Sequence, residues 1–166
     1  MRGVVRTKNW LMSEDDCYDL IDSAENGVLA TVNAEGQPCT TALNHVLIDH
    51  TLYFHSGLEG EKIDNLKVNP QVSYFIIGVA DVIYDQFTTA FSSVVVNGVM
   101  EFVEDHDEKL RALTALVDRF SNELIPPQVK TDFIADGVNC VLILKLDAQN
   151  ATGKARLSRK RPCLRY

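Results

Sequence analysis

The chain has 166 residues, a net charge of −7 at pH 7 and an isoelectric point near 5.0. This length accommodates one domain with a substantial core, and a composition of 46% hydrophobic and 23% charged residues is typical of soluble globular proteins. The acidic balance argues against a nucleic-acid-binding protein, and the sequence has no apolar run long enough for a membrane span.

The cysteines and the first residues bear on cellular location. None of the four cysteines forms a C-x-x-C unit with another, so a zinc site is not predicted. The first residues lack the apolar segment of a signal peptide. We therefore expect a cytoplasmic protein with reduced thiols.

The N-terminal part is predicted to form an arm and a helix. Residues 1–12 make up the arm, which docks on the remainder of the chain. Ser13 begins the helix, because Ser13 and Asp16 approximate a capping box. Asn26-Gly27 ends it, since glycine accepts the left-handed conformation that is common at helix C-termini.

Three antiparallel strands are predicted next, over residues 27–32, 38–48 and 51–55. The length of the loop before the third strand determines where two histidines point. A three-residue loop would place His45 directly opposite His55 on one face of the hairpin. A two-residue loop would turn the two histidines to different faces.

The second half of the chain alternates strands and helices less regularly. Asn69-Pro70 stops a short helix, and Gly98 marks a candidate bulge or bend in a long strand. The predicted elements are a helix at 60–68, strands at 71–79 and 88–104, an irregular segment at 81–86, helices at 105–120 and 128–135, and a last strand at 138–146 that is buried on both faces.

About six strands with short connections favour antiparallel pairing, and closure of the sheet would remove its exposed edges. We therefore predict a mainly β fold, a small β-barrel with peripheral helices, over residues 13–150. Residues 151–166 form a basic C-terminal tail, since six of the 16 lysines and arginines lie in the last 13 positions. The tail is either solvated, or closes over an anionic ligand or an acidic neighbouring surface.

Lys62 indicates a candidate anion site. A cation in the first turn of a helix is unfavourable, because the start of a helix carries partial positive charge. A bound phosphate would reverse this effect, and Ser56 and Gly57 precede the helix in a segment suited to holding an anion. We predict a phosphate here, with His55 facing the group to which the phosphate is attached.

Two other kinds of chemistry are not predicted. Ser56, Ser92 and Ser93 have no histidine and aspartate partners in a readable triad, which argues against acyl transfer. His45 and His55 lack a third ligand of the right type nearby, which argues against a metal site.

Five segments together carry a resemblance to a known family. They are Gly27-Val28-Leu29-Ala30-Thr31, Leu52-Tyr53-Phe54-His55-Ser56, the pattern from Gly60 through Lys62, Leu66 and Asn69-Pro70 to Tyr74, the pattern Phe91-x-Ser93-Val94-x-Val96-x-Gly98, and Ala151-Thr152-Gly153-Lys154. In this order and spacing they resemble the flavin-binding split-barrel proteins related to pyridoxamine 5′-phosphate oxidase. Within that group the chain is most similar to the nitroimidazole-resistance proteins.

The resemblance implies a six-stranded antiparallel split β-barrel with Greek-key topology, and a homodimer that binds FMN at its interface. It implies that Ser56, Gly57 and Lys62 hold the phosphate and that His55 lies beside the flavin as the catalytic residue. The other cofactor-binding positions that it implies are the strand segment Thr41, Ala42, Leu43, Asn44 and His45, followed by Phe91, Ser92, Ser93 and Lys154.

The chain departs from the family at two arginine positions. Glu61 stands where the oxidases have an arginine beside the lysine, and Thr41 stands where they have one on the second strand. This predicts weaker FMN binding or compensation by Lys154 and Arg156, and it argues against pyridoxamine phosphate oxidation. Ser92 also replaces an arginine that is frequent in the nitroimidazole branch, which leaves the substrate open.

The resemblance therefore implies an FMN-dependent reductase of small conjugated electron acceptors such as nitroimidazoles. A nicotinamide electron donor is a further expected partner, and neither nucleic acid nor a membrane is expected. The alternative is a non-catalytic module of the same fold that binds a flavin, a deazaflavin or haem.

Overall fold

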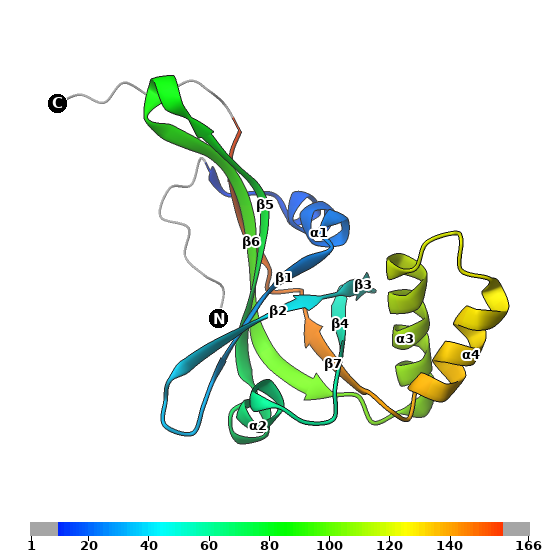
Figure 1. The fold of residues 1–166 in the computed structure, drawn as a ribbon. Helices are drawn as coiled ribbons and strands as arrows, with labels where there is room; N and C mark the ends of the chain where they lie inside the picture. The colour runs from blue at the N-terminus through cyan, green and yellow to red at the C-terminus, as the bar shows by residue number, and fades with distance from the viewer. Residues whose placement is uncertain (1–9, 158–166) are drawn as a thin grey trace.

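The computed structural model describes residues 10–157. They form a twisted antiparallel sheet with helices packed around it (Figure 1). The elements are α1 (Glu14–Ser23), β1 (Asn26–Val32), β2 (Pro38–Asn44), β3 (Val46–Ile48), β4 (Thr51–Ser56), α2 (Glu61–Val68), β5 (Gln71–Ile83), a 3₁₀ turn (Tyr84–Gln86), β6 (Thr88–Phe102), α3 (His106–Phe120), α4 (Pro127–Gly137), β7 (Leu142–Asp147) and β8 (Thr152–Arg156).

The strands follow the order β2-β1-β5-β6-β7-β4-β3, and β8 pairs with β6 beside this path. All of these pairs are antiparallel. The mainly β fold with peripheral helices is confirmed, but the ladder of hydrogen bonds is not closed among the described residues. The structure has eight strands where six were predicted.

Three element predictions were wrong in detail. The strand predicted at 38–48 is split into β2 and β3, because His45 turns inward between them. The segment 81–86 was expected to be irregular, but β5 continues to Ile83 after a register shift between Ile77 and Ala80. The bulge therefore lies in β5, while Gly98 pairs regularly with Val72.

The C-terminal region also differs from the prediction. Residues 138–141 precede β7, which begins only at Leu142. Thr152–Arg156 form β8, which pairs with residues 91–95 of β6, so the sheet extends into the segment predicted to be a tail. The part of the predicted tail over 158–166 and the part of the predicted arm over 1–9 lie outside the described residues.

Local signals account for the helix starts. The capping box of α1 is present, with the Ser13 hydroxyl accepting from the Asp16 N–H at 3.1 Å and donating to the Asp16 carboxylate at 2.6 Å. Asp105 caps α3 in the same way, through a bond of 2.8 Å from the Glu108 N–H. In contrast, Gly60 precedes α2 without any side-chain cap.

Two cores meet at β4 and β7. Phe54, Tyr74 and Leu144 belong to the core inside the curved sheet, whereas Tyr53 and Ile143 belong to a second core beneath α3. Neighbouring residues of one strand thus face different cores, as the period of two requires. The prediction that the last strand is buried on both faces is confirmed.

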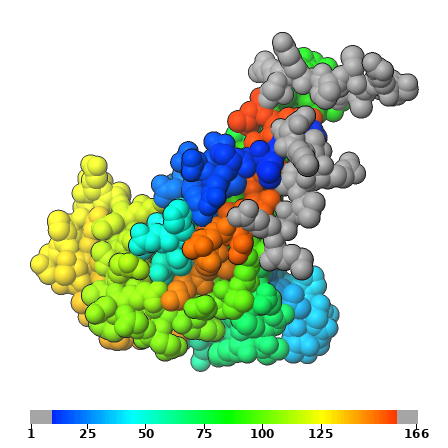
Figure 2. Space-filling view, turned by 180° about the vertical axis from the view of Figure 1, so that it is seen from behind, coloured from blue at the N-terminus to red at the C-terminus, as the bar shows by residue number. Residues whose placement is uncertain are grey.

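A polar cluster fixes α3 over this second core. The Tyr53 hydroxyl donates to the Glu108 carboxylate at 2.8 Å, and the Lys145 ammonium donates to the same carboxylate at 3.0 and 3.1 Å. From behind, α3 and α4 form a lobe on one side of the molecule, and α2 lies near the opposite side (Figure 2). His55, the exposed residue of β4, shares a pocket with residues of α3 and α4.

Candidate functional site

A tight turn determines the geometry of the site. Asp49 and His50 both have positive φ, at 49° and 63°, and form a two-residue loop between β3 and β4. Val46 consequently pairs with Tyr53, so that His45 and His55 point to different faces. Of the two loops compatible with the sequence, the structure has the shorter one.

His45 is part of the core. Its side chain is fully buried, its Nε2–H donates to the Ile21 carbonyl at 2.8 Å, and its Nδ1 lies 2.9 Å from the Tyr74 hydroxyl. Burial lowers the pKa of this imidazole. A side chain held in this way cannot contact a cofactor, and the predicted contact through the main chain of His45 stays a prediction.

The rest of the predicted flavin strand alternates between two faces. Ala42 and Asn44 are exposed, whereas Thr41 and Leu43 are half-buried and turn toward the sheet interior. The Leu43 carbonyl accepts from the Tyr74 hydroxyl at 2.8 Å, and the Asn44 amide donates to the Glu25 carbonyl at 3.0 Å. At His45 the chain leaves its pairing with β1, and from Val46 onward it pairs with β4 as strand β3.

The segment after β4 retains several features of an anion site. Ser56 is buried and its hydroxyl has no hydrogen-bond partner among the described residues. Gly57 is exposed, Gly60 has a φ of 129°, and Lys62 is half-buried with no ion pair among the described residues. A buried hydroxyl without a partner is a group for which a bound oxyanion can supply one.

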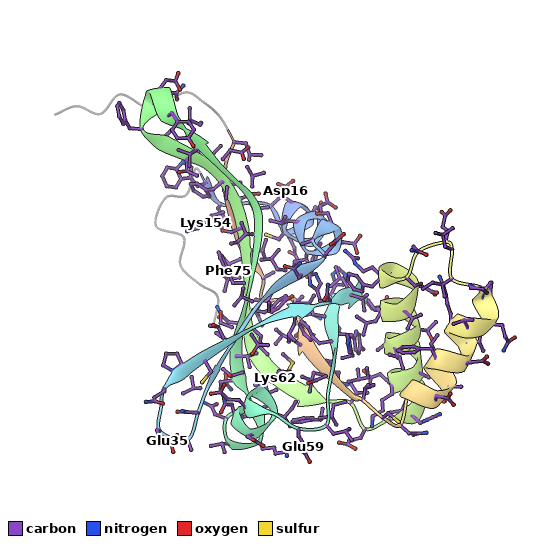
Figure 3. All side chains as sticks on the ribbon, viewed as in Figure 1. Asp16, Glu35, Glu59, Lys62, Phe75 and Lys154 are labelled. Carbon is purple, nitrogen blue, oxygen red and sulfur yellow. The ribbon has the colours of Figure 1, made fainter. Side chains whose placement is uncertain are left out.

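Glu61, in the first turn of α2, carries a negative charge at the position where the oxidases of the resembling family have an arginine. Its carboxylate accepts from the Cys39 thiol at 3.2 Å, which joins the start of α2 to β2. This hydrogen bond raises the pKa of Cys39. Asn65 makes the second link, donating to the Thr31 hydroxyl of β1 at 3.0 Å. The start of α2 is therefore fixed against β1 and β2, with Lys62 in its first turn (Figure 3).

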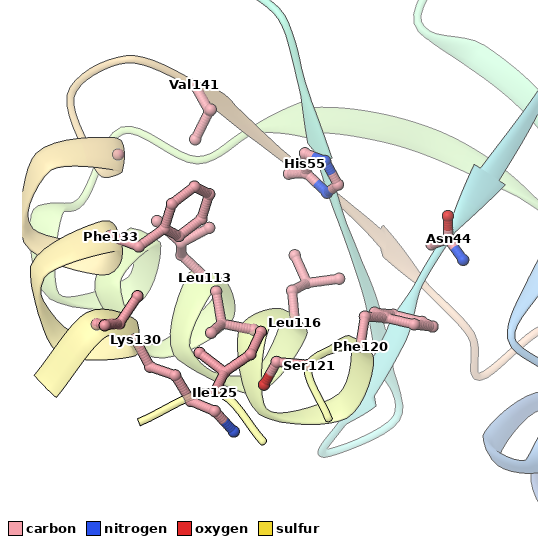
Figure 4. Close-up of a pocket in the computed structure, with 13 residues that line it drawn as sticks. Asn44, His55, Leu113, Leu116, Phe120, Ser121, Ile125, Lys130, Phe133 and Val141 are labelled. Atoms are coloured by element: carbon pink, nitrogen blue, oxygen red, sulfur yellow. The ribbon is translucent and has the colours of Figure 1, made fainter. Parts of the chain in front are cut away.

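His55 is exposed on the face of β4 that also carries Tyr53. It forms no hydrogen bond with the described residues. It lines a pocket that is otherwise built mainly from apolar side chains of α3 and α4 (Figure 4). Asn44 lines the same pocket, so the ends of β2 and β4 contribute one residue each. This pocket was not predicted from the sequence, because the pattern at 128–135 predicts a helix but not the surface on which it packs.

The remaining predicted site residues lie elsewhere in the chain. The Ser92 hydroxyl accepts from the Val79 N–H at 2.9 Å and is buried against Gly78. Ser93 pairs with Lys154, whose ammonium lies 5.6 Å from the centre of the Phe91 ring. These residues surround the junction of β6 and β8.

Two groups of predicted site residues thus lie far apart within one chain. Phe102 pairs with Leu144 of β7, next to the pair that Ile143 forms with His55. Nine residue steps of extended strand lead from Ser93 to Phe102, which corresponds to about 30 Å along the strand. The structure brings together His55 and Asn44, and it does not bring either to Ser93 or Lys154.

An apolar row crosses the outer face of the sheet. Val28 pairs with both Ala42 and Phe75, Phe75 pairs with Val95, and Val95 pairs with Thr152. Val28 is 37% exposed, and Phe75 and Val95 are half-buried. The sequence alone did not reveal this row, because its members come from five strands whose register it leaves undetermined.

The part of the chain that the structure describes holds neither a metal cluster nor a membrane-spanning helix. Among residues 10–157, no group of three or more histidine, cysteine, aspartate or glutamate side chains could hold a metal ion. None of the helices in this range is both long and apolar enough to cross a membrane.

The chain is similar to several known proteins. Residues 13–155 match the family described as pyridoxamine 5′-phosphate oxidase. None of the curated proteins compared with it matches. A conserved hypothetical protein from Mycobacterium tuberculosis has a TM-score of 0.77 at 22% identity, over 96% of this chain and 99% of its own.

Two further solved structures share the fold. A protein from Bacteroides thetaiotaomicron, provisionally named for 5-nitroimidazole antibiotic resistance, has a TM-score of 0.71 at 24% identity, over 87% of this chain and 85% of its own. A protein of Mycobacterium smegmatis, described as binding FAD and haem, has a TM-score of 0.72 at 16% identity, over 91% of this chain and 75% of its own. At these identities the likeness establishes the fold.

Proposed function

Because the chain belongs to the pyridoxamine 5′-phosphate oxidase family, we propose that it binds FMN at the interface of a homodimer and reduces a small conjugated acceptor. One observation carries this proposal. Lys62, with no ion pair among the described residues, stands in the first turn of the uncapped helix α2, six positions after Ser56, whose buried hydroxyl has no partner among the described residues. An oxyanion would supply a partner to both groups.

Several groups would hold the cofactor. The Lys62 ammonium and the first two N–H groups of α2 would bind the phosphate, since the N–H groups of Ile63 and Asp64 already donate to the Gly60 carbonyl. Gly57 would leave the backbone accessible. The main chain from Thr41 to Asn44 of β2, together with His45 after it, would lie along the isoalloxazine edge. The flavin would supply the electron chemistry, while the protein orients it and limits access of water.

A homodimer accounts for the separation of the predicted site residues. We propose an interface on the outer face of the sheet, where a two-fold axis would bring the Phe91–Lys154 region of one subunit near the Lys62 region of the other. The apolar row that includes Val28, Phe75 and Val95 supports this choice, since homodimer interfaces are enriched in apolar area. Lys154 would then come to the cofactor from the partner subunit.

The acceptor class follows from His55 and Glu61. The Glu61 carboxylate beside Lys62 disfavours a second phosphate, which argues against pyridoxamine phosphate as substrate. His55 is exposed beside the apolar pocket, and its imidazole is a side chain that can deliver a proton to a nitro or quinone-like acceptor. A nicotinamide would serve as electron donor. We propose a cytoplasmic location, where Cys17, Cys39 and Cys140 would stay reduced.

A non-catalytic binding module is the second candidate. The exposed imidazole of His55 at the edge of a largely apolar pocket is the arrangement that an axial haem ligand needs. Deazaflavin is a further possible occupant of the same fold. Haem gives an intense absorbance band near the ultraviolet edge of the visible range, whereas flavin gives two weaker bands. The absorbance spectrum therefore distinguishes bound haem from bound flavin.

The test is the absorbance spectrum and oligomeric state of the purified protein, followed by addition of FMN. We expect a dimer that takes up FMN and then passes electrons from a nicotinamide to a nitroimidazole. A colourless protein that takes up no FMN would refute the flavin proposal. FMN uptake without turnover would favour the binding module.

A further inference from the structure

A pocket of about 400 Å³ lies between α3, α4 and the end of β4 (Figure 4). Its helical wall is apolar and includes Leu116 and Phe120 of α3 and Phe133 of α4. His55 near the end of β4 and Asn44 at the end of β2 line its other side. The pocket therefore joins an apolar lobe to the strand ends at which the flavin is proposed to bind.

The helical wall is incompletely buried. No residue of α4 is buried, and Val129 and Phe133 are 53% and 61% exposed although both are apolar and both face the pocket. Phe120 on the facing helix is 40% exposed. Apolar surface that converges on a cavity from two helices is the usual lining of a small-molecule site.

The polar groups around the pocket have unused hydrogen-bonding capacity. The Ser121 hydroxyl is buried and has no partner among the described residues. The His55 imidazole is also without a hydrogen bond to them. A few polar groups in an apolar lining fix the orientation of a ligand and recognise its carbonyl or nitro oxygens.

The charge of the lining argues against a cationic ligand, and its largely apolar surface favours a neutral one. It contains no carboxylate, and Lys130 directs its ammonium away from His55 (Figure 4). The pocket volume falls within the range of roughly 300–1,000 Å³ that suits drug-sized ligands. A single five-membered ring with small substituents would leave much of the helical wall uncovered.

We propose that this pocket binds a neutral, apolar, conjugated ring compound larger than a nitroimidazole, of which a bicyclic quinone is the simplest example. The proposal rests on the proposed function for the place of the flavin beside His55. It names the class of acceptor that the α3–α4 lobe selects. Ring carbonyl oxygens would accept from His55 and Ser121, and the fused rings would cover Leu116 and Phe133.

Menadione and 2-methyl-5-nitroimidazole are suitable test ligands. Equilibrium dialysis of the full chain, with and without added FMN, gives their dissociation constants. We expect saturable menadione binding that is about tenfold or more tighter than binding of the nitroimidazole, equivalent to about 1.4 kcal/mol.

Val129→Trp tests the location, because the larger ring fills the pocket from an exposed position of α4. Leu124→Trp is the matched control, since Leu124 is 87% exposed and does not line the pocket. We expect menadione affinity to fall about tenfold in the first variant and to change less than about twofold in the second. FMN uptake should be equal in both variants.

The outcomes separate this inference from the proposed function. Menadione binding without FMN uptake would overturn the flavin proposal and leave the pocket standing. FMN uptake without saturable menadione binding, or equal loss in both tryptophan variants, would overturn the pocket. Conversion of the Val129→Trp protein, but not the Leu124→Trp protein, to a smaller oligomer would show that a second copy covers the lobe, and would also overturn it.

Discussion

His45 and His55 lie on one β-hairpin but in opposite environments. His45 is buried in the sheet interior and bonded to the Ile21 carbonyl, with Tyr74 at its other nitrogen. His55 is exposed, lacks a hydrogen bond to the described residues, and faces the α3–α4 pocket. The direction in which each side chain points, and not the residue type, places one histidine in the core and leaves the other exposed at the pocket, where we propose that it takes part in the chemistry.

Alanine substitution at the two positions tests this division on folding. His45→Ala removes the partner of the Ile21 carbonyl and leaves a cavity, so we expect the free energy of unfolding to fall by about 3 kcal/mol. His55→Ala should change it by less than about 0.5 kcal/mol, because the side chain is exposed. Denaturant unfolding measures both values. Similar losses in the two variants would contradict the division.

A conservative substitution of His55 tests its chemical role. His55→Gln keeps a polar side chain but cannot deliver a proton near neutral pH, so we expect nitroimidazole reduction to slow roughly 100-fold. Stopped-flow oxidation of the reduced protein measures the rate, and FMN affinity should stay within about threefold. An unchanged rate would remove His55 from the chemistry, and a parallel loss of FMN affinity would make it a binding residue.

Acidification tests the environment of His45. Burial lowers its pKa, so below pH ~6.5 the unfolded chain binds a proton that the folded chain does not. The stability that the neutral His45 contributes is fully present above that pH. It is lost as the pH falls toward the pKa of His45 in the folded state, at no more than about 1.4 kcal/mol per pH unit. The free energies of unfolding of the wild type and His45→Gln, measured in denaturant at pH 7.5, 6.5 and 5.5, isolate the pH dependence that is due to His45. Identical pH profiles would show that the folded and unfolded pKa values are equal.

The sequence predicted elements whose signals are local. The capping box at Ser13, the acidic start of α3 and the apolar strand 51–55 need only short-range patterns, and each is present. The strand β4, the turn after it and the helix α2 with Lys62 in its first turn are also as predicted. These features require no knowledge of which strands pair.

The features that depended on register could not be predicted. Asp49 and His50 both adopt positive φ, which is uncommon outside glycine, and this turn decides which face carries His55. β8 contains a glycine, a lysine and an arginine within five residues, and it becomes a strand only by pairing with β6. The pocket requires α4 to pack on α3, a tertiary contact that weak periodicity in α4 does not reveal.

The central claim is that a phosphate-bearing flavin binds at the start of α2, and FMN titration of three proteins tests it most directly. Lys62→Ala removes the predicted phosphate ligand. Lys67→Ala is the matched control in the last turn of the same helix, where the ammonium lies 3.9 Å from Asp64. Flavin fluorescence measures the dissociation constant for each protein.

We expect the wild type to bind one FMN per chain. Affinity should fall about tenfold or more in Lys62→Ala, as loss of a charge-assisted hydrogen bond to phosphate implies. Affinity in Lys67→Ala should stay within about twofold of the wild type. Equal affinity in all three proteins, or no FMN binding by the wild type, would contradict the account.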